Sequence, residues 1–330
     1  MRAAFVTGYG DNSVVSHGQL PEPVVGADQA LVEVRAAGIN PVEIAMRAGL
    51  FHAAFPFTFP QIMGFDIAGV VRSAPKNSPF KVDDEIYARL PNRTLGAYAE
   101  RVAVPLNLLA LKPKRLNFAE AASLPTVALT TWQAFIERAR LARGEHILIQ
   151  AGAGGVGSFA IQLAKHLGAT VTATASATNQ EFMARLGADR TVDYAKEKFE
   201  DAGPFDVVYD GVCGPLVERG IASLKSGGRY VGLVRMADTQ SYREIGFPEA
   251  IAAGAAAGVQ AYVKQAHDRG AEFHGPLTRP DGAQLADIAA IVDTGAISAT
   301  VTGTYGLEGL AAAYDALATG RTRGKLVITI

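Results

Sequence analysis

The period of the apolar positions changes near residue 118 of the chain. Before it, apolar and polar residues alternate in short stretches such as Leu31–Ala36, which has two valines on one face and a glutamate and an arginine on the other. Alternation with a period of two is typical of a half-buried β-strand. Comparable stretches at 62–71 and 98–104 are separated by proline-rich turns, so residues 1–117 predict a mainly β unit.

After residue 118, strand-length apolar runs alternate with stretches of helical periodicity. Strands are predicted at 146–151, 170–174, 191–192, 205–209 and 229–234. Helices are predicted from the glycine-rich turn at 152–157 to a stop at Gly168, at 179–186 and at 215–224. This alternation predicts a parallel, doubly wound sheet. Beyond about residue 277, a helix at 284–294 and a closing strand at 324–330 are expected, and the alanine-rich stretch 249–257 reads as helix.

A glycine-rich turn joins the first of these strands to the helix that follows it. Residues 152–157 read Gly-Ala-Gly-Gly-Val-Gly. In a βαβ unit, Gly152 would permit a tight turn, Gly154 would let the backbone approach phosphates, and Gly157 would let helix and strand pack closely. An ordinary loop is the alternative, but a plain turn needs one glycine and this one has four in six residues. The turn therefore predicts a dinucleotide pyrophosphate at a helix N-terminus.

Composition indicates a globular enzyme of two domains. The 330 residues exceed what one hydrophobic core usually holds, and 49% of them are hydrophobic. A formal charge of −1 offers no basic field for nucleic acid or for anionic membranes, and no apolar run reaches the roughly 20 residues that span a bilayer. The N-terminal residues lack a secretory pattern, and the single cysteine, Cys213, cannot form an internal disulfide. We therefore expect a cytoplasmic protein.

Several ordered segments resemble the zinc-free medium-chain dehydrogenase/reductases, the family of quinone oxidoreductases, enone reductases and zeta-crystallin-like proteins. The matching segments are residues 37–43, 64–71, 96–100, 128–134, 152–157, 186–189, 226–229 and 324–325. The resemblance implies an α/β fold in which a doubly wound parallel Rossmann sheet, residues 118–276, is inserted in a GroES-like mainly β domain made of residues 1–117 and 277–330. It also implies a substrate cleft between the domains and a homodimer.

No metal site is expected. The zinc-dependent relatives use thiolates for a structural zinc and a cysteine with a histidine for a catalytic one, but this chain has one cysteine. Phe65 stands where those relatives carry a ligand histidine. His146 and His166 read as packing or surface residues rather than as ligands.

The expected cofactor is NADPH rather than NADH. An NAD site normally has an acidic residue about 20 residues after the glycines, and none lies between Ser158 and Gln180. Instead Ser176, Thr178 and Asn179 could donate hydrogen bonds to a 2′-phosphate. NADPH-using relatives often have a lysine where Asn179 stands, so the predicted preference is modest.

The resemblance also assigns residues to the cofactor and to the reaction. Gly155, Val156, Val231 and Lys325 match positions that contact the cofactor. Tyr194 matches a position that stacks near the adenosine phosphate, although an aromatic residue covering the sheet edge is the alternative.

The resemblance implies that Asn40 and Thr130 are polar groups at the nicotinamide end, where donors to the oxygen on which negative charge develops are needed. For Thr130 the alternative is a bond only to the ribose or the carboxamide of the cofactor. For Asn40 the alternative is a turn residue that caps its own backbone. Ala45 stands where relatives often have tyrosine or lysine, which opens the pocket, and the loop with Phe51, Phe55, Phe57 and Phe59 either lines an apolar pocket or packs in the core.

The resulting hypothesis is an NADPH-dependent reductase of quinones or α,β-unsaturated carbonyls, acting on a small electrophile without zinc. Two alternatives remain: an enoyl-thioester reductase, and a redox-silent NADPH-binding protein.

Overall fold

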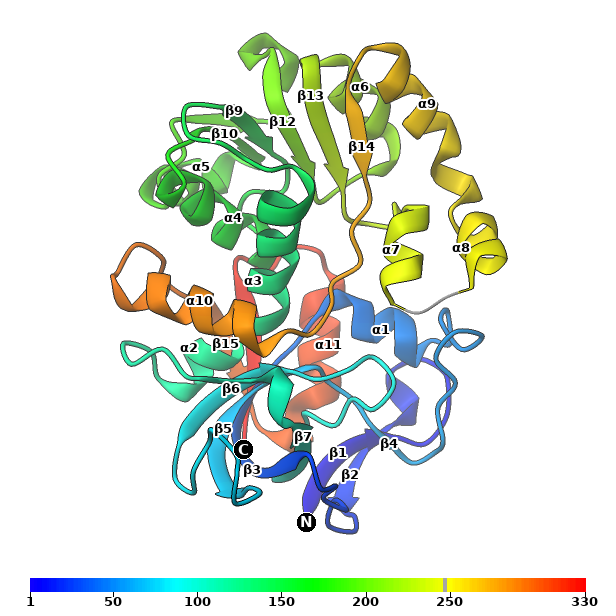
Figure 1. The fold of residues 1–330 in the computed structure, drawn as a ribbon, viewed down its shortest axis with the longest axis vertical. Helices are drawn as coiled ribbons and strands as arrows, with labels where there is room; N and C mark the ends of the chain where they lie inside the picture. Colours follow the sequence, from blue (N-terminus) through cyan, green and yellow to red (C-terminus); the bar gives the residue numbers. More distant parts are fainter. Residues whose placement is uncertain (246–247) are drawn as a thin grey trace. The chain divides into compact units, whose positions relative to one another are not determined.

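The chain divides into two units, Met1–Leu129 with Pro280–Ile330 (unit 1) and Thr130–Arg279 (unit 2). The computed structural model describes residues 1–245 and 248–330 (Figure 1). The sequence placed the boundaries at 117/118 and 276/277. The first boundary lies later because α2 (Phe118–Ala122) packs on strands β3 and β5 of unit 1.

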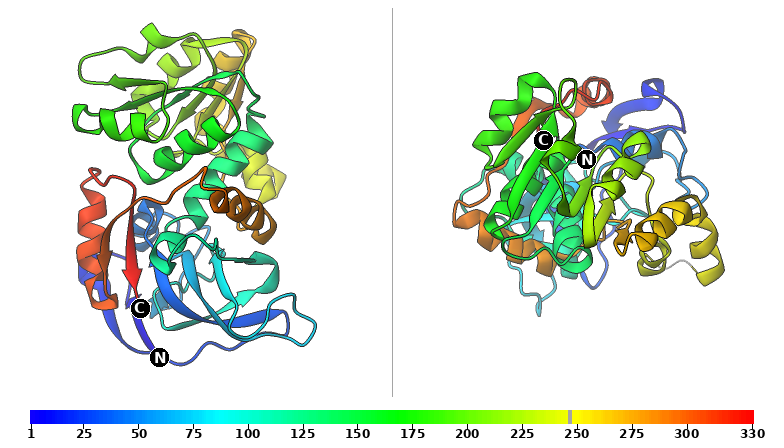
Figure 2. Two further views of the ribbon diagram at one scale, coloured as in Figure 1. Left: turned by 90° about the vertical axis from the view of Figure 1, so that its left-hand side faces the viewer. Right: turned by 90° about the horizontal axis from the view of Figure 1, so that it is seen from above.

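Unit 2 is built on one sheet of parallel strands (Figures 1 and 2). Its six strands are β9 (His146–Ile149), β10 (Thr170–Ala175), β11 (Arg190–Asp193), β12 (Phe205–Asp210), β13 (Leu224–Gly232) and β14 (Glu272–His274). Their order is β11-β10-β9-β12-β13-β14. The chain direction across the sheet reverses between β9 and β12, and in doubly wound sheets ligands bind outside the carboxyl ends of the strands at such a switch point.

The helices of unit 2 connect these strands. They are α4 (Gly155–His166), α5 (Gln180–Arg185), α6 (Val217–Ala222), α7 (Thr239–Glu244), α8 (Glu249–Ala255) and α9 (Gln260–Asp268). Helix α4 packs on β9 and β10, whereas α6 and α9 pack together over β12, β13 and β14. The predicted alternation of strand and helix is confirmed, including the alanine-rich helix α8. Helix α3 (Pro125–Trp132) contains the boundary between the units and continues into a π-helix, Gln133–Arg138.

Unit 1 contains two sheets and the second hydrophobic core. One sheet has the order β15-β16-β3-β5-β6-β8, with β7 paired to β3, and the other has the order β2-β1-β4. The strands are β1 (Arg2–Val6), β2 (Val15–Gln19), β3 (Gln29–Gly38), β4 (Gln61–Ile62), β5 (Asp66–Ser73), β6 (Glu85–Arg89), β7 (Arg101–Pro105), β8 (Leu109–Leu111), β15 (Val301–Tyr305) and β16 (Lys325–Thr329). Strand β16 pairs with β3, so strands from the N-terminal and C-terminal parts of the sequence share one sheet.

Three further helices of unit 1 accompany α2. They are α1 (Pro41–Arg47), α10 (Gly282–Asp293) and α11 (Leu310–Ala318). The sequence predicted α10 but neither α1 nor α11. Helix α1 is short and begins with a proline at its first turn, directly after Asn40. Over the described ranges, no helix is both long enough and apolar enough to cross a membrane.

Candidate functional site

The glycine turn of unit 2 is tight, but the residue that makes it so is not the one predicted. Ala151 adopts the left-handed conformation with φ of +54°, and Gly152 does not. A Cβ atom on Gly152 would lie 2.7 Å from the Met183 Sδ atom and 3.0 Å from the Ala173 Cβ atom. Gly152 is therefore required for close packing, and the role assigned to it from the sequence is corrected.

The other two turn glycines differ from each other in their surroundings. A Cβ on Gly157 would lie 2.3 Å from the carbonyl oxygen of Ala151, so this position accepts only glycine. Gly154 has an ordinary φ of −72°, and a Cβ at this position would meet its nearest atom, a carbonyl oxygen, at 3.5 Å. Gly154 is the N-cap of the 12-residue helix α4 and supplies no side-chain cap. The first N–H groups of α4, which begins with Gly155 and Val156, thus receive no side-chain cap and could bind an anion.

Gln150 lies between strand β9 and this turn, beside the switch point. Its side chain is only 2% exposed, yet neither its amide nitrogen nor its amide oxygen has a hydrogen-bond partner. On the neighbouring strand, the Asp210 carboxylate is fully used, accepting from the backbone N–H groups of Val212 (2.8 Å) and Cys213 (2.7 Å) and from the Tyr230 hydroxyl (2.6 Å). A polar ligand at this place would supply the missing hydrogen-bond partners of the carboxamide. Together with the uncapped helix, it fits a nicotinamide dinucleotide.

The residues predicted for the ribose end do gather at one edge of the sheet. The Ser176 hydroxyl lies 3.3 Å from that of Thr178 and accepts a hydrogen bond of 3.1 Å from the Asn179 amide. The backbone N–H of Tyr194 donates to the carbonyl of Ala175 (3.3 Å), and the Tyr194 side chain is 67% exposed. These four polar side chains therefore follow β10 and β11, where the adenosine end of a dinucleotide would lie.

Two further predicted residues of unit 2 are placed by the structure. Val231 is buried in β13 between Tyr209 of β12 and His274 of β14. The Thr130 hydroxyl lies 2.6 Å from that of Thr278.

Asn40 of unit 1 belongs to a buried ionic cluster. Its amide nitrogen donates to the carboxylates of Glu43 (3.1 Å) and Asp66 (3.0 Å), and its amide oxygen accepts from the Lys325 ammonium (2.5 Å). The side chain makes no capping bond to helix α1. The capping alternative is therefore wrong, and a donor role toward substrate would require one of these carboxylate bonds to break.

The same cluster fixes Lys325. Its ammonium also donates to the carbonyl of Ile39 (2.6 Å) and lies 3.9 Å from the Asp66 carboxylate. Asp66 in turn accepts from the backbone N–H of Thr126 (3.0 Å) and from its hydroxyl (2.6 Å). The Lys325 ammonium is thus committed within unit 1, and its predicted cofactor contact stays a prediction.

Burial governs the ionisation of this cluster. It raises the pKa of Glu43 to about 7, although hydrogen bonds from Tyr98 and Asn40 act in the opposite direction. Burial also raises the pKa of Asp66 and lowers that of Lys325, in each case against the attraction between these two groups. Glu43 and Asp66 were not predicted from the sequence, because the bonds from Tyr98 to Glu43 and from Asn40 to Asp66 join residues 55 and 26 positions apart and leave no local pattern.

Phe65, which stands where zinc-dependent relatives carry a ligand histidine, is a buried packing residue. The Arg89 guanidinium lies over the Phe65 ring, 4.7 Å from its centroid. Within the ranges that the structure describes, no three histidine, cysteine, aspartate or glutamate side chains are arranged to hold a metal ion. Cys213, the single thiol, is buried, and burial raises its pKa to about 11.

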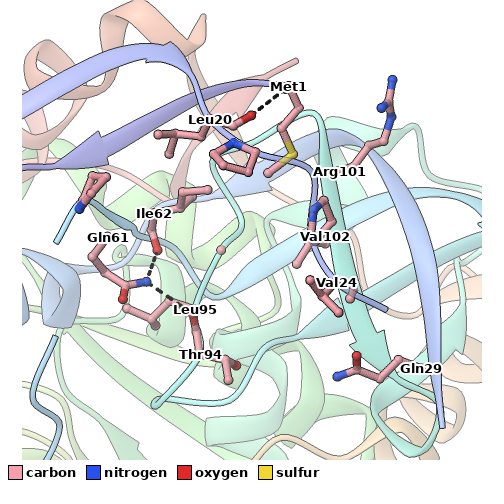
Figure 3. Close-up of a pocket in the computed structure, with 15 residues that line it drawn as sticks. Met1, Leu20, Val24, Gln29, Gln61, Ile62, Thr94, Leu95, Arg101 and Val102 are labelled. Atoms are coloured by element: carbon pink, nitrogen blue, oxygen red, sulfur yellow. Dashed lines mark hydrogen bonds between the residues drawn. The ribbon is translucent and has the colours of Figure 1, made fainter. Parts of the chain in front are cut away.

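A pocket of about 420 Å³ lies in unit 1 (Figure 3). Its wall is largely aliphatic, with Leu20, Val24 and Leu95 among the lining residues. The amide nitrogen of Gln61 donates to the carbonyls of Ile62 (2.7 Å) and Thr94 (3.3 Å). None of the predicted site residues lines this pocket.

The aromatic loop of unit 1 is anchored by Tyr9. The Tyr9 ring stacks on Phe57 with centroids 5.6 Å apart and meets the Phe59 ring edge-on at 5.0 Å. Phe55, Phe57 and Phe59 pack against the core of unit 1, while Phe51 is 39% exposed. Core packing is therefore the role that the structure shows for most of this loop.

The chain matches two family models over parts of its length and known proteins over all of it. Residues 26–114 match the family described as "Alcohol dehydrogenase GroES-like domain", and residues 186–328 match the one described as "Zinc-binding dehydrogenase". A human protein, the mitochondrial NAD(P)H oxidoreductase RTN4IP1, is 33% identical over 100% of this chain and 89% of its own length.

A chloroplastic NADPH-dependent alkenal/one oxidoreductase of Arabidopsis thaliana is 39% identical over 74% of this chain. That alignment spans 65% of the relative, which is less than two thirds of its length. Among solved structures, the quinone oxidoreductase from Coxiella burnetii has a TM-score of 0.85 and 29% identity, with 100% of this chain and 99% of that chain covered.

Proposed function

Because this chain belongs to the zinc-free medium-chain dehydrogenase/reductase family, we propose that it is an NADPH-dependent reductase of quinones or α,β-unsaturated carbonyls. The observation that carries the proposal is the carboxyl edge of the unit 2 sheet. There the uncapped N-terminus of α4 and the orphaned amide of Gln150 lie at a switch point of a parallel sheet. Both features are accounted for by a bound dinucleotide.

The protein residues would bind and orient, and the bound cofactor would supply the hydride. The N–H groups of Val156 and Gly157 would hold the pyrophosphate, and Ser176 and Asn179 the ribose end. The side-chain amide of Gln150 would form hydrogen bonds with polar groups of the nicotinamide half of the cofactor. A conjugated acceptor needs only this positioning and a donor for its carbonyl oxygen, since water can protonate the resulting enolate.

The donor to the substrate oxygen is the part of the proposal that the geometry revises. Both N–H groups of Asn40 are given to carboxylates that burial makes expensive to leave unpaired. We therefore assign Asn40 to holding the cluster with Glu43, Asp66 and Lys325. The hydroxyl of Thr130 lies beside that of Thr278 and outside the carboxylate cluster, so it is the better candidate for a donor.

The test is a screen of NADPH oxidation against quinones, alkenals, cyclic enones, enoyl thioesters and saturated ketones. The proposal expects turnover of quinones or of enones, and no useful oxidation of secondary alcohols. Turnover confined to enoyl thioesters would favour the enoyl-thioester reductase instead. Tight NADPH binding without turnover on any acceptor would identify a redox-silent binding protein.

Two expectations from the sequence stay predictions. A homodimer would be seen as twice the chain mass in light scattering, and cytoplasmic location requires localisation in cells. The preference for NADPH over NADH is likewise part of the proposal.

A further inference from the structure

A polar hollow of about 460 Å³ opens in unit 2 where β11 ends. It is lined by Tyr194, Ala195, Lys196, Glu197, Lys198, Glu200 and Arg219. Arg219 is committed to Glu200 through two hydrogen bonds of 2.6 and 2.9 Å. The cations of this hollow that are not held in such a pair are the two lysines.

Lys196 follows β11, the strand that pairs with β10, and the predicted ribose-binding residues Ser176, Thr178 and Asn179 follow β10. Its ammonium is 3.9 Å from the Asp193 carboxylate, and Asp193 pairs with Ala175 across the parallel strands. The turn that contains Ser176 is fastened to the same place, because the Gln180 amide donates to the carbonyls of Ala175 (3.0 Å) and Val192 (3.3 Å). The ammonium is therefore placed beside Asp193 at the carboxyl end of β11, and the backbone of Asp193 pairs with that of Ala175, the residue before Ser176.

The pairing of Lys196 with Asp193 leaves its hydrogens available. At 3.9 Å the two groups are beyond hydrogen-bonding distance, and the Lys196 side chain is 76% exposed. Asp193 is itself engaged, since its carboxylate accepts from the backbone N–H of Ala195 (3.2 Å). A doubly charged phosphate beside Ser176 would draw the ammonium with charge-assisted hydrogen bonds.

Resting on the NADPH-dependent function proposed above, we infer that Lys196 is the cation that recognises the 2′-phosphate of the cofactor. It approaches from the end of β11 and takes the role that a lysine at position 179 would otherwise have, since Asn179 is neutral. The exposed ring of Tyr194 supplies an adjoining surface for adenine. The residue that favours NADPH over NADH would thus lie after β11, at Lys196, and not in the turn after β10.

The experiment compares Lys196→Met with Lys198→Met, a matched loss of charge in the same hollow. Calorimetric titrations use four ligands: NADPH, NADH, adenosine 2′,5′-bisphosphate and AMP. Lys196→Met should weaken NADPH and adenosine 2′,5′-bisphosphate by about tenfold, as expected for one exposed charge-assisted contact, and NADH and AMP by less than about twofold. Lys198→Met should leave all four within about twofold. The effect of Lys196→Met should shrink as salt screens the charge.

The outcomes separate this inference from the function on which it rests. If the parent binds NADPH more tightly than NADH and Lys196→Met keeps the full preference, the inference is wrong and the proposed function stands. An equal loss in Lys198→Met would also overturn it, because a diffuse field would then explain the preference. A parent that binds neither dinucleotide overturns the proposed function itself.

Discussion

Two buried amides, Asn40 of unit 1 and Gln150 of unit 2, differ in their hydrogen-bond partners. In unit 1, Asn40 is surrounded by Glu43, Asp66 and Lys325, and each of its polar atoms has a partner. In unit 2, the amide of Gln150 is just as buried but has no partner, and helix α4 begins without a side-chain cap. Both regions are polar and inaccessible, yet only one is complete by itself.

The difference supports a structural role for the Asn40 cluster and agrees with the dinucleotide site proposed beside Gln150. A satisfied buried cluster contributes a defined geometry, and its members cannot readily turn to a substrate. An unsatisfied group at the switch point of a parallel sheet costs stability in the free protein, and a bound dinucleotide would recover that cost. Asn40 and Gln150 are both buried amides, but Asn40 is bonded to protein side chains and Gln150 has no partner.

Replacing Lys325 with Met should produce the largest effect on stability. The change leaves the Asp66 carboxylate and the Asn40 amide oxygen without their cation in a fully buried place. The free energy of unfolding should fall by about 3–5 kcal/mol, as measured by urea denaturation. A loss below about 1 kcal/mol would contradict the structural role of the cluster.

The pH dependence of stability should expose Glu43. Because burial raises its pKa in the folded protein from 4.5 to about 7, the folded state holds a proton that the unfolded state has released between these values. Stability should therefore fall as pH rises from about 4.5 to 7, by up to ~1.4 kcal/mol per pH unit, and level off above 7. The groups facing Glu43 are Asn40, Tyr98, Tyr314 and, through charge, Asp66 and Lys325.

The matched variant for this prediction is Glu43→Gln, which cannot titrate. The stability of the parent relative to this variant should decline across the window from pH 4.5 to 7, in denaturation curves recorded at several pH values. A difference that does not change with pH would show that Glu43 is not protonated in the folded protein near neutrality.

Alanine substitutions at two glycines of the turn, Gly157 and Gly154, should distinguish a loss of stability from a loss of dinucleotide binding. Gly157→Ala places a Cβ 2.3 Å from a backbone oxygen and should lower the free energy of unfolding by about 1–3 kcal/mol. Gly154→Ala meets no atom closer than 3.5 Å, so its stability should change by less than about 0.5 kcal/mol. Its affinity for dinucleotide should nevertheless fall. If both variants lose stability equally, the distinction between the two glycines is wrong.

The smallest expected effect concerns Cys213, which has φ of +59° and ψ of −147°, a region that suits glycine. An alanine retains this backbone strain and a glycine relieves it. Cys213→Gly should therefore be more stable than Cys213→Ala by about 1 kcal/mol, the reverse of the usual order at a buried position. Thermal unfolding of the two variants measures this difference. A Cys213→Ala variant more stable than Cys213→Gly would contradict the prediction.

The sequence was sufficient for the features that depend on local pattern. The turn at 152–157, strand β10 and helix α4 were predicted because the apolar spacing and the glycines act over a few residues. It was insufficient where a role depends on distant partners. Asn40 was identified as a polar residue of interest, but its bond to Lys325 joins residues 285 positions apart, so its commitment could not be foreseen.

Within the turn, sequence reasoning located the motif correctly but assigned the conformation to the wrong residue. Ala151 carries the positive φ, because Gly152 is needed where Met183 and Ala173 press on the chain. The short helix α1 was missed for a related reason, since its seven residues give too little periodicity to distinguish a helix from a turn.

The most direct test of the account follows the hydride itself. The protein would be incubated with an enone or a quinone and NADPH deuterated at C4 of the nicotinamide, with and without a chelator. We expect deuterium on the carbon β to the carbonyl of the enone or, with a quinone, quinol formed in equal amount to the NADPH oxidised, and the same rate in chelator. Failure to reduce any conjugated acceptor, or activity that chelation abolishes and zinc restores, would contradict a metal-independent reductase.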